Sequence, residues 1–255
     1  MDIEYNFNKK YYETHKNFNN ECDIKTLDLN NFKSKGKMLT IVQNCPYADG
    51  LKHLRYITDN HPLIINEDNL NRWRKYDKVG SQGNHQLIYG ISPKVFSYIK
   101  EILLFYTYFL KPKNIEKLDN LLVIGGGYGM ELVLLYDILN LINVKVNKIY
   151  GVDMKNVSEL QNFFFKSVNM ENICKSYDDT LELDKIDCIY SNCCLAEVPP
   201  EINFKYYTNY FLKTENAYIV WTHLFSEIPK YYKAHTSNIL EPYNLCKNCS
   251  TLIFK

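Results

Sequence analysis

The chain has 255 residues, of which 46% are hydrophobic and 23% are charged, and its net charge at pH 7 is +1. This composition suits one globular α/β domain with an appended region, and the balanced charge argues against nucleic acid as a partner. No apolar run reaches the ~18 residues that a membrane-spanning helix needs, and the polar, acidic start differs from a secretory signal. We therefore expect a cytoplasmic protein with no membrane partner.

Residues 1–75 form the first expected unit of the chain. They are rich in Asn, Lys and Tyr, and their apolar segments are short, such as residues 38–42. We expect a small, mainly helical region on the substrate side of the molecule, followed by a larger α/β domain over residues 76–255.

A helix is predicted over residues 92–110, because Ser92 suits the N-cap, Pro93 the first helical position, and Lys111-Pro112 ends the apolar pattern. Strand and helix segments then alternate. The expected strands cover residues 121–124, 148–152, 186–190 and 217–221, the expected helices residues 130–141, 157–168 and 202–211, and a closing strand residues 250–254. This alternation, with continuous apolar strands, predicts a parallel sheet that is covered by helices on both faces.

A glycine-rich loop follows the first expected strand. It comprises Gly125, Gly126, Gly127, Tyr128 and Gly129. Glycines let the backbone take positive φ and approach a ligand closely, and the helix that follows offers unpaired N–H groups, so the loop predicts a nucleoside cofactor. A dinucleotide fingerprint would need a third glycine at position 130, where this chain has Met130. The shorter G-x-G-x-G spacing resembles the first motif of class I S-adenosylmethionine (SAM) methyltransferases, which implies SAM as the cofactor.

The second expected strand ends in a carboxylate. Asp153 directly follows residues 148–152 and is succeeded by Met154. An acid at this place accepts hydrogen bonds from ribose hydroxyls in nucleoside-binding α/β folds. The separation from Gly125 exceeds the roughly 20 residues that are usual, and a polar stretch over residues 143–147 absorbs the excess. We predict that Asp153 and Met154 bind the cofactor.

Further polar residues follow the other strands and are expected at the same edge of the sheet. Asp178 and Asp179 lie between two strands and are placed to bond the adenine amino group, with a solvated loop as the alternative. Ser191 and Asn192 end the third expected strand, and Glu197 follows them. We therefore predict Asp178, Asp179, Ser191 and Asn192 as cofactor ligands.

Four segments together carry a family resemblance. They are Lys75 to Gly80, Ile91 to Lys100, Gly125 to Gly129, and Tyr190 to Glu197. In order and spacing they resemble the sugar O-methyltransferase family over roughly residues 70–225. The resemblance implies a SAM-binding, Rossmann-like class I methyltransferase sheet, mostly parallel with an antiparallel C-terminal hairpin. It also implies methyl transfer from SAM to a hydroxyl of a nucleotide-linked sugar or a glycan.

One position departs from the pattern of class I methyltransferases. These enzymes usually carry an acid two residues before the first glycine, where this chain has Val123, and Glu131 is a nearby substitute. The sequence therefore leaves open a catalytically silent methyltransferase-fold binding protein. It equally leaves open a methyltransferase that acts on RNA or another small molecule, and a nicotinamide-dependent oxidoreductase.

Methylation of a sugar hydroxyl needs a group that takes the proton. His223 follows the strand at residues 217–221 and is one candidate base; Glu197, which the resemblance also places at the site, is the other. Asp77 and His85 come from the N-terminal side and are candidates for binding sugar hydroxyls. The partner is then a small-molecule or glycan acceptor, and the oligomeric state, a homodimer included, stays open.

The eight cysteines are scattered rather than spaced as a disulfide scaffold, which favours reduced thiols. Cys246 and Cys249 form a lone C-x-x-C pair without the second pair that a four-ligand zinc site needs. We predict no metal site, although Asp178-Asp179 leaves magnesium open. Abundant Asn, Lys, Ile and Tyr are typical of AT-rich genomes, such as those of large DNA viruses and some bacteria.

Overall fold

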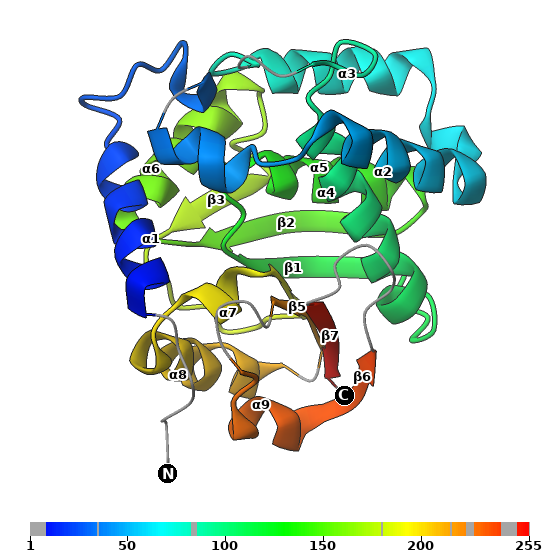
Figure 1. The fold of residues 1–255 in the computed structure, drawn as a ribbon. Helices are drawn as coiled ribbons and strands as arrows, with labels where there is room; N and C mark the ends of the chain where they lie inside the picture. The colour runs from blue at the N-terminus through cyan, green and yellow to red at the C-terminus, as the bar shows by residue number, and fades with distance from the viewer. Residues whose placement is uncertain are drawn as a thin grey trace.

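The computed structural model describes residues 9–34, 36–82, 86–179, 181–214, 216–222, 227–240 and 249–254 (Figure 1). A run of helices comes first: α1 (Lys9–Glu21), η1 (Phe32–Ser34), η2 (Met38–Val42), α2 (Tyr47–Asn60), η3 (Pro62–Ile64) and α3 (Glu67–Lys78). The later helices are α4 (Pro93–Phe105), η4 (Tyr106–Leu110), α5 (Met130–Leu141), α6 (Lys155–Ser167), α7 (Cys194–Glu197), α8 (Pro200–Asn209), η5 (Phe211–Lys213) and α9 (Lys230–His235). The strands are β1 (Lys117–Ile124), β2 (Lys145–Val152), β3 (Cys174–Tyr177), β4 (Cys188–Asn192), β5 (Ala217–Thr222), β6 (Thr236–Leu240) and β7 (Cys249–Phe254).

Within the described residues, the strands form one seven-stranded sheet in the order β3-β2-β1-β4-β5-β7-β6. Strands β1 to β5 run parallel to their neighbours. The chain passes from β3 at one edge to β4 on the far side of β1, so the strand order reverses between β1 and β4. Open α/β sheets bind ligands at the carboxyl ends of the strands beside such a switch point.

The fold-class prediction needs a correction at the C-terminus. The Rossmann-like part of the sheet consists of five of the described strands, all parallel, in the order β3-β2-β1-β4-β5. Strands β6 and β7 are not part of it. Strand β7 pairs antiparallel with β5, and β6 pairs antiparallel with β7. Residues 241–248, which would hold the turn of the expected hairpin, lie outside the described residues. The structure thus shows two added antiparallel strands and not the predicted hairpin.

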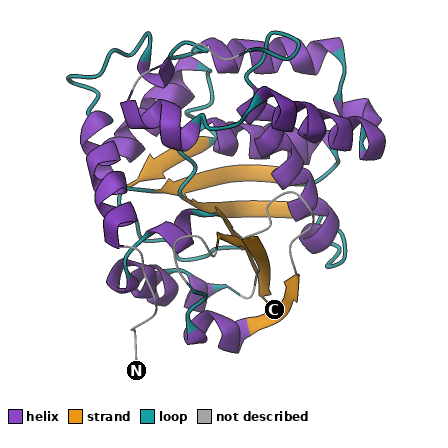
Figure 2. Ribbon diagram, viewed as in Figure 1, coloured by secondary structure: helices purple, strands orange, loops and turns teal. Residues whose placement is uncertain are grey.

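Helices cover both faces of the sheet, as the alternating side chains of its central strand require (Figure 2). Leu121 and Val123 of β1 belong to the hydrophobic cluster that packs under α2, α3, α4, α5 and α6. Leu122 and Ile124 belong to the second cluster, which packs against α8 and α9. Successive residues of a strand point to opposite faces, and here both faces are apolar, which explains why the strand reads as one continuous apolar run.

The predicted helix at residues 92–110 is present, although its last turn is the π-helical η4. Ser92 is its N-cap, but the Ser92 hydroxyl makes no capping bond to the helix. The main-chain N–H and the hydroxyl of Ser92 instead both donate to Asp77 Oδ2 at 2.7 Å. A carboxylate from α3 therefore accepts hydrogen bonds from the N-cap residue of α4, and these bonds fix the two helices to each other.

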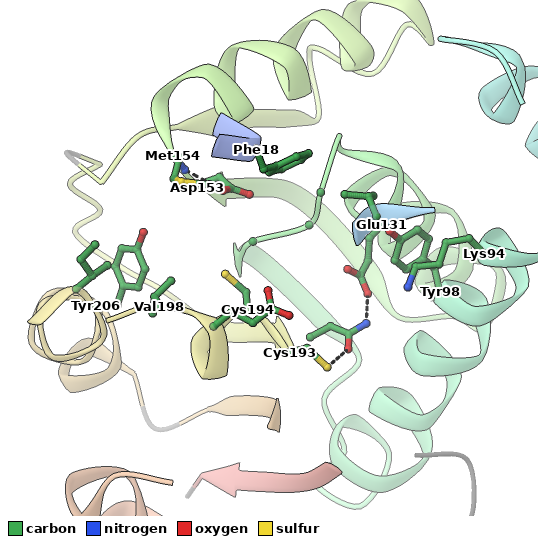
Figure 3. Close-up of a pocket in the computed structure, with 17 residues that line it drawn as sticks. Phe18, Lys94, Tyr98, Glu131, Asp153, Met154, Cys193, Cys194, Val198 and Tyr206 are labelled. Atoms are coloured by element: carbon green, nitrogen blue, oxygen red, sulfur yellow. Dashed lines mark hydrogen bonds between the residues drawn. The ribbon is translucent and has the colours of Figure 1, made fainter. Parts of the chain in front are cut away.

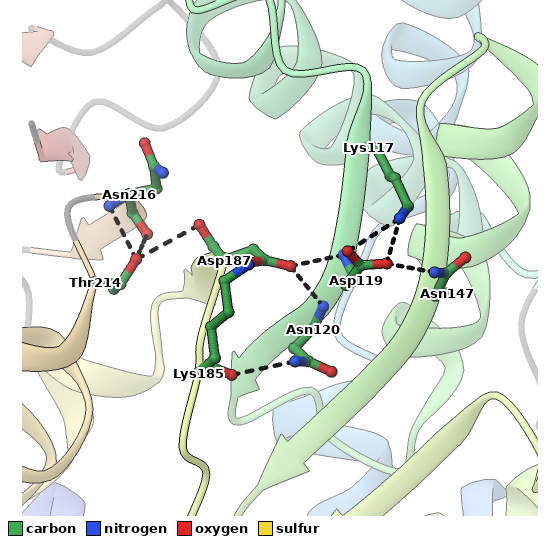
Figure 4. Close-up of polar contacts among 8 residues, drawn as sticks. All are labelled: Lys117, Asp119, Asn120, Asn147, Lys185, Asp187, Thr214 and Asn216. Carbon is green, nitrogen blue, oxygen red and sulfur yellow. Dashed lines mark hydrogen bonds and ion pairs between the residues drawn. The ribbon is translucent and has the colours of Figure 1, made fainter.

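A polar network lies at the amino ends of the strands, the edge opposite the switch point (Figure 4). Asp187 Oδ2 accepts the main-chain N–H groups of Asp119 at 2.7 Å and Asn120 at 2.9 Å. Lys185 Nζ pairs with Asp187 Oδ1 at 3.0 Å. These bonds join β1 to the segment that enters β4, so we assign Asp187 a structural role.

Among the helices that the structure describes, none has the length and apolarity that crossing a bilayer requires. Helix α3 runs through the expected division between residues 75 and 76, and one hydrophobic cluster includes residues from both sides of it. The division into two domains stays a prediction.

Candidate functional site

A cavity of about 220 Å³ opens at the carboxyl ends of the central strands (Figure 3). Its lining comes from the loop after β1, from the ends of β2 and β4, and from helices of both halves of the chain. The lining residues are Phe18, Val42, Lys94, Tyr98, Gly125, Gly126, Gly127, Glu131, Asp153, Met154, Asn192, Cys193, Cys194, Glu197, Val198, Ile202 and Tyr206. The cavity thus occupies the place where this topology binds ligands.

The glycine loop forms the floor of the cavity with its backbone. Gly125, Gly126 and Gly127 have φ values of +93°, +104° and +58°, a region in which residues with a Cβ are strained. A Cβ on Gly125 would lie 2.6 Å from Cys194 Cβ, and a Cβ on Gly127 would lie 2.7 Å from Val42 Cγ1. The loop therefore needs glycine both for its turn and for its close approach to neighbouring segments.

The rest of the predicted loop serves packing rather than the cavity. Tyr128 is only 1% exposed, and its ring packs edge-on against Phe164 at 5.1 Å and Phe32 at 5.6 Å between ring centroids. Gly129 has φ +106° and is the N-cap of α5. Neither residue lines the cavity, so these two predicted cofactor ligands position the loop from behind.

Asp153 lies at the end of β2 and lines the cavity. Asp153 Oδ1 accepts the main-chain N–H of Met154 at 2.8 Å, and Asp153 Oδ2 accepts from Gln161 Nε2 at 3.1 Å. Burial raises the pKa of Asp153 to about 7, against the lowering effect of these two hydrogen bonds. The structure brings Asp153 and Met154 together with the glycine loop, as the spacing predicts for cofactor ligands.

Gln161 is a site residue that the sequence pattern did not indicate. It is fully buried in α6, and its Nε2 donates to Gly127 O at 2.8 Å as well as to Asp153. Gln161 Oε1 accepts from the hydroxyl of Ser176 on β3. Gly151 of β2 leaves room for this side chain, because a Cβ there would lie 3.0 Å from Gln161 Oε1 and 2.8 Å from Ser176 Oγ. A glycine inside a strand was the one signal in the sequence that could have pointed to it.

Glu131 lies on the other side of the glycine loop from Asp153 (Figure 3), and Asn192 of β4 contacts it there. Glu131, on the first turn of α5, is buried, and its Oε1 accepts from Asn192 Nδ2 at 2.8 Å and from the hydroxyl of Tyr190 at 2.9 Å. Burial raises the pKa of Glu131 to about 7, although both hydrogen bonds and the charge of Lys94 act to lower it. Two donors from β4 thus hold this carboxylate at the cavity wall.

Glu197 also lines the cavity, at the end of the short helix α7. Burial raises the pKa of Glu197 to about 8, with Lys94 lowering it and Asp153 raising it further. The chain reaches Glu197 through Cys193, whose φ of +65° is rare for a residue with a side chain. After this turn, Cys194 and Glu197 of α7 line the cavity. A carboxyl group with this pKa can exchange a proton near neutral pH.

Apolar side chains form the remaining walls. Met154, Val198 and Tyr206 lie on the side of Asp153, and Phe18 of α1 lies nearby (Figure 3). Ile202 of α8 also lines the cavity. Helix α1 is held there because Asn156, in the first turn of α6, bonds Asn19 through its main-chain N–H and its side chain, at 3.1 and 3.0 Å. The N-terminal helices therefore contribute to the cavity.

Three further predicted cofactor ligands, Ser191, Asp178 and Asp179, do not line the cavity. Ser191 is fully buried, and its hydroxyl donates to the carbonyl oxygen of Ile124 at 3.2 Å, so it fastens β4 to β1. Asp178 and Asp179 follow β3, and Asp179 Oδ2 accepts from Lys205 Nζ on α8 at 2.6 Å. Their role as cofactor ligands stays a prediction.

Asp77 is placed elsewhere than the sequence predicts. It is fully buried, its Oδ2 accepts from Ser92, and its Oδ1 pairs with the buried Lys33 at 3.2 Å. A carboxylate so enclosed has no access to a sugar hydroxyl, so its role is structural. The predicted residues His85 and His223 lie outside the described residues.

The cavity fits SAM by the chemistry of its lining. The glycine backbone leaves space for close contact, Asp153 offers carboxylate oxygens for ribose hydroxyls, and the apolar wall from Met154 to Tyr206 offers a surface for adenine. Over the ranges described above, no group of three or more His, Cys, Asp or Glu residues is arranged to hold a metal ion. The strand order and this cavity together define a Rossmann-like α/β fold with a ligand site at its switch point.

Comparisons with known proteins give similar solved structures only. No family model matches the sequence, and no curated protein matches it. Among solved structures, magnesium protoporphyrin IX methyltransferase (ChlM) from Synechocystis PCC 6803, with bound SAM, is 13% identical over 82% of this chain and 97% of that chain, with a TM-score of 0.45. The mitomycin 7-O-methyltransferase MmcR is 10% identical over 82% of this chain and 67% of that chain, with a TM-score of 0.46. The methyltransferase domain of the bacterial protein CtHen1 is 12% identical over 61% of this chain and 97% of that chain, with a TM-score of 0.45. At these identities and TM-scores the similarities support no conclusion about function. The function of this chain must be argued from its own residues.

Proposed function

We propose that this protein is a SAM-dependent methyltransferase that methylates a hydroxyl group of a sugar, either nucleotide-linked or within a glycan. The observation that carries the proposal is the cavity in which the glycine loop, Asp153 and Asn192 converge from the ends of β1, β2 and β4. The sugar as acceptor is supported by the resemblance of four sequence segments to the sugar O-methyltransferase family.

The side chains of this cavity suit methyl transfer to oxygen. SAM, when bound, supplies a methyl group on a positively charged sulfur, and that sulfur keeps the bonding electron pair when the methyl group leaves. The chain must then orient the acceptor oxygen in line with this bond and take the hydroxyl proton. We propose Glu197 for the proton, because its carboxyl group lines the cavity and its pKa of about 8 lies near the operating pH.

The decisive experiment is titration calorimetry with SAM and S-adenosylhomocysteine (SAH). We expect micromolar binding of both ligands, little binding of NAD(H), and a loss of about tenfold or more in Asp153→Ala, since hydrogen bonds to a charged group contribute about 1.5–3 kcal/mol. Asp187→Ala, at the opposite edge of the sheet, is the control for effects of mutation on folding. Binding of NAD(H) without SAM would refute the proposal.

The acceptor is then found by incubating the protein with SAM and panels of nucleotide sugars and glycans, and measuring released SAH. Transfer to a sugar hydroxyl would support the full proposal. Transfer to RNA or to another small molecule would support the methyltransferase activity and refute the sugar as the acceptor. Tight SAM binding with no transfer across the panels would favour a methyltransferase-fold binding protein.

A further inference from the structure

The cavity has an end at which a carboxylate and an ammonium group of the protein lie close together. Figure 3 shows Glu131 beside Lys94 and Tyr98, with the glycine loop between this end and Asp153. Within the described residues, Glu131 and Lys94 form no ion pair with each other. Opposite charges that face one cavity without pairing with each other suit a ligand that carries both charges.

Glu131 is oriented for a cationic ligand. Its Oε1 is occupied by donors from Tyr190 and Asn192, whereas its Oε2 accepts no hydrogen bond from any residue that the structure describes. Since Tyr190 is fully buried and Asn192 lies at the end of β4, the carboxylate is fixed with one oxygen turned to the protein. The second oxygen is available to a ligand in the cavity.

Lys94 supplies the complementary charge. It is the second residue of α4 and lines the cavity, and its Nζ lies 4.8 Å from the centre of the Tyr98 ring. Among the described side chains, no carboxylate lies within ion-pair distance of Lys94 Nζ. Its charge nevertheless lowers the pKa of both Glu131 and Glu197, although burial outweighs it at each, which places Lys94 within electrostatic reach of the cavity interior.

The position that usually carries the acid cannot take this role here. Val123 is 1% exposed, belongs to the hydrophobic cluster under α4 and α5, and does not line the cavity. The cavity wall next to the glycine loop is formed instead by Glu131, in the first turn of α5. An acid is therefore present at the cavity, but on the helix rather than on the strand.

From this arrangement we infer that Glu131 binds the α-ammonium group and Lys94 the α-carboxylate of the amino-acid end of the cofactor. The inference rests on the proposed function. Asp153 and the apolar wall, on the other side of the loop, then hold the nucleoside end. The two ends of the cofactor are thus recognised by separate groups, and Glu131 replaces the acid that is missing at Val123.

The test compares two ligands that differ only at this end. SAH carries the amino-acid group, and 5′-methylthioadenosine has the same nucleoside thioether without it. We expect Glu131→Gln and Lys94→Met each to raise the Kd of SAH about tenfold or more while leaving the Kd of methylthioadenosine unchanged, since only charge-assisted bonds to the amino-acid group are lost. Because methylthioadenosine must still bind, a variant that fails to fold is recognised at once.

Asp137→Asn is the matched control. Asp137 is a buried carboxylate on the same helix as Glu131, it pairs with Arg72 at 3.5 Å, and it does not line the cavity. We expect this variant to bind both ligands as the unchanged protein does. If Glu131→Gln weakens both ligands equally, or neither, the assignment is wrong while the proposed function stands. If the unchanged protein binds neither ligand, the assignment and the proposed function are both wrong.

Discussion

Gln161 joins Asp153 to the glycine loop: its side-chain amide donates to Asp153 Oδ2 at 3.1 Å and to the carbonyl oxygen of Gly127 at 2.8 Å. The two groups that would contact the nucleoside are therefore held by one side chain from α6. Gln161 Oε1 in turn accepts from Ser176 of β3, so this buried amide is bonded at both of its ends. It orients the candidate ligands without lining the cavity itself.

Gln161→Leu is expected to weaken binding of SAH by about tenfold and to lower the free energy of unfolding by about 1–3 kcal/mol. The physical reason is that Asp153, Gly127 and Ser176 each lose a buried partner, and an unsatisfied buried polar group carries this cost. Calorimetry measures the affinity, and urea unfolding measures the stability. An unchanged affinity together with lower stability would show that Gln161 supports the fold alone.

Asn162, the next residue of α6, provides the control for this prediction. Its side chain donates to the carbonyl oxygen of Ser176 at 2.7 Å and accepts the main-chain N–H of Ser176 at 2.9 Å, and among the described residues it has no hydrogen bond to Asp153 or the glycine loop. Asn162→Leu should therefore lower stability by a similar amount and leave the affinity for SAH unchanged.

The sequence predicted the elements best where periodicity and turn chemistry agree. The helix expected at residues 130–141 is α5 with the same bounds, and Gly125, Asp153 and Asn192, predicted from strand ends, line one cavity. Strand β3, at the edge of the sheet, was missed because its four residues, Cys174 to Tyr177, include two adjacent polar side chains and form no apolar run. So short a segment has no periodicity that distinguishes it from a loop.

The polar residues of the site were harder to assign, because one residue type serves both binding and folding. Asp77 lies near the end of a helix and reads as an exposed ligand, yet its partner Lys33 lies 44 positions away in the sequence. In the sequence, Gln161 and Lys94 have the pattern of ordinary helix-surface residues. In the structure, Lys94 lines the cavity, and Gln161 is buried behind its wall. Pairings between distant positions have no local pattern, and so only the three-dimensional structure reveals them.

Asp77→Asn is expected to lower the free energy of unfolding by about 3–5 kcal/mol, because it leaves the buried ammonium group of Lys33 without its charged partner. Urea unfolding measures the effect. Asp49→Asn is the control, since the Asp49–Lys52 pair is exposed to solvent and such pairs contribute about 0–1 kcal/mol. A stable Asp77→Asn protein that binds its acceptor poorly would instead support the sequence-based role of Asp77 in sugar binding.

The stability of the ligand-free protein should fall as the pH rises from about 6.5 to 8. Burial raises the pKa of Glu131 and Asp153 to about 7 and that of Glu197 to about 8. Below these pKa values the folded protein keeps protons that the unfolded chain has already released. Each such group therefore lowers the free energy of unfolding by about 1.4 kcal/mol for every unit by which the pH rises, until the group ionises in the folded protein. His53, whose pKa burial lowers to about 4, acts in the opposite direction but only below pH ~6.5.

Differential scanning calorimetry at several pH values checks this expectation, with a decrease in Tm of roughly 2–4 °C for each kcal/mol lost. Glu197→Gln cannot ionise at this position and should therefore show a flatter profile between about pH 7 and 8, the range in which Glu197 alone still holds its proton. A Tm that rises with pH across this window would mean that these carboxylates are already ionised in the folded protein.

Glu197→Gln should also separate proton transfer from cofactor binding. The amide keeps the size of the side chain but cannot take a proton, so we expect the rate of methyl transfer to fall by roughly 10²–10⁴-fold while the Kd of SAH stays unchanged. In the unchanged protein, the pH profile of transfer should rise up to about pH 8, the pKa of Glu197, and the variant should lose this rise. Released SAH measures the rate with the acceptor that the panel identifies. Glu201→Gln, exposed in the first turn of α8, should retain both the rate and its pH dependence; equal rates in the two variants would exclude Glu197 as the base.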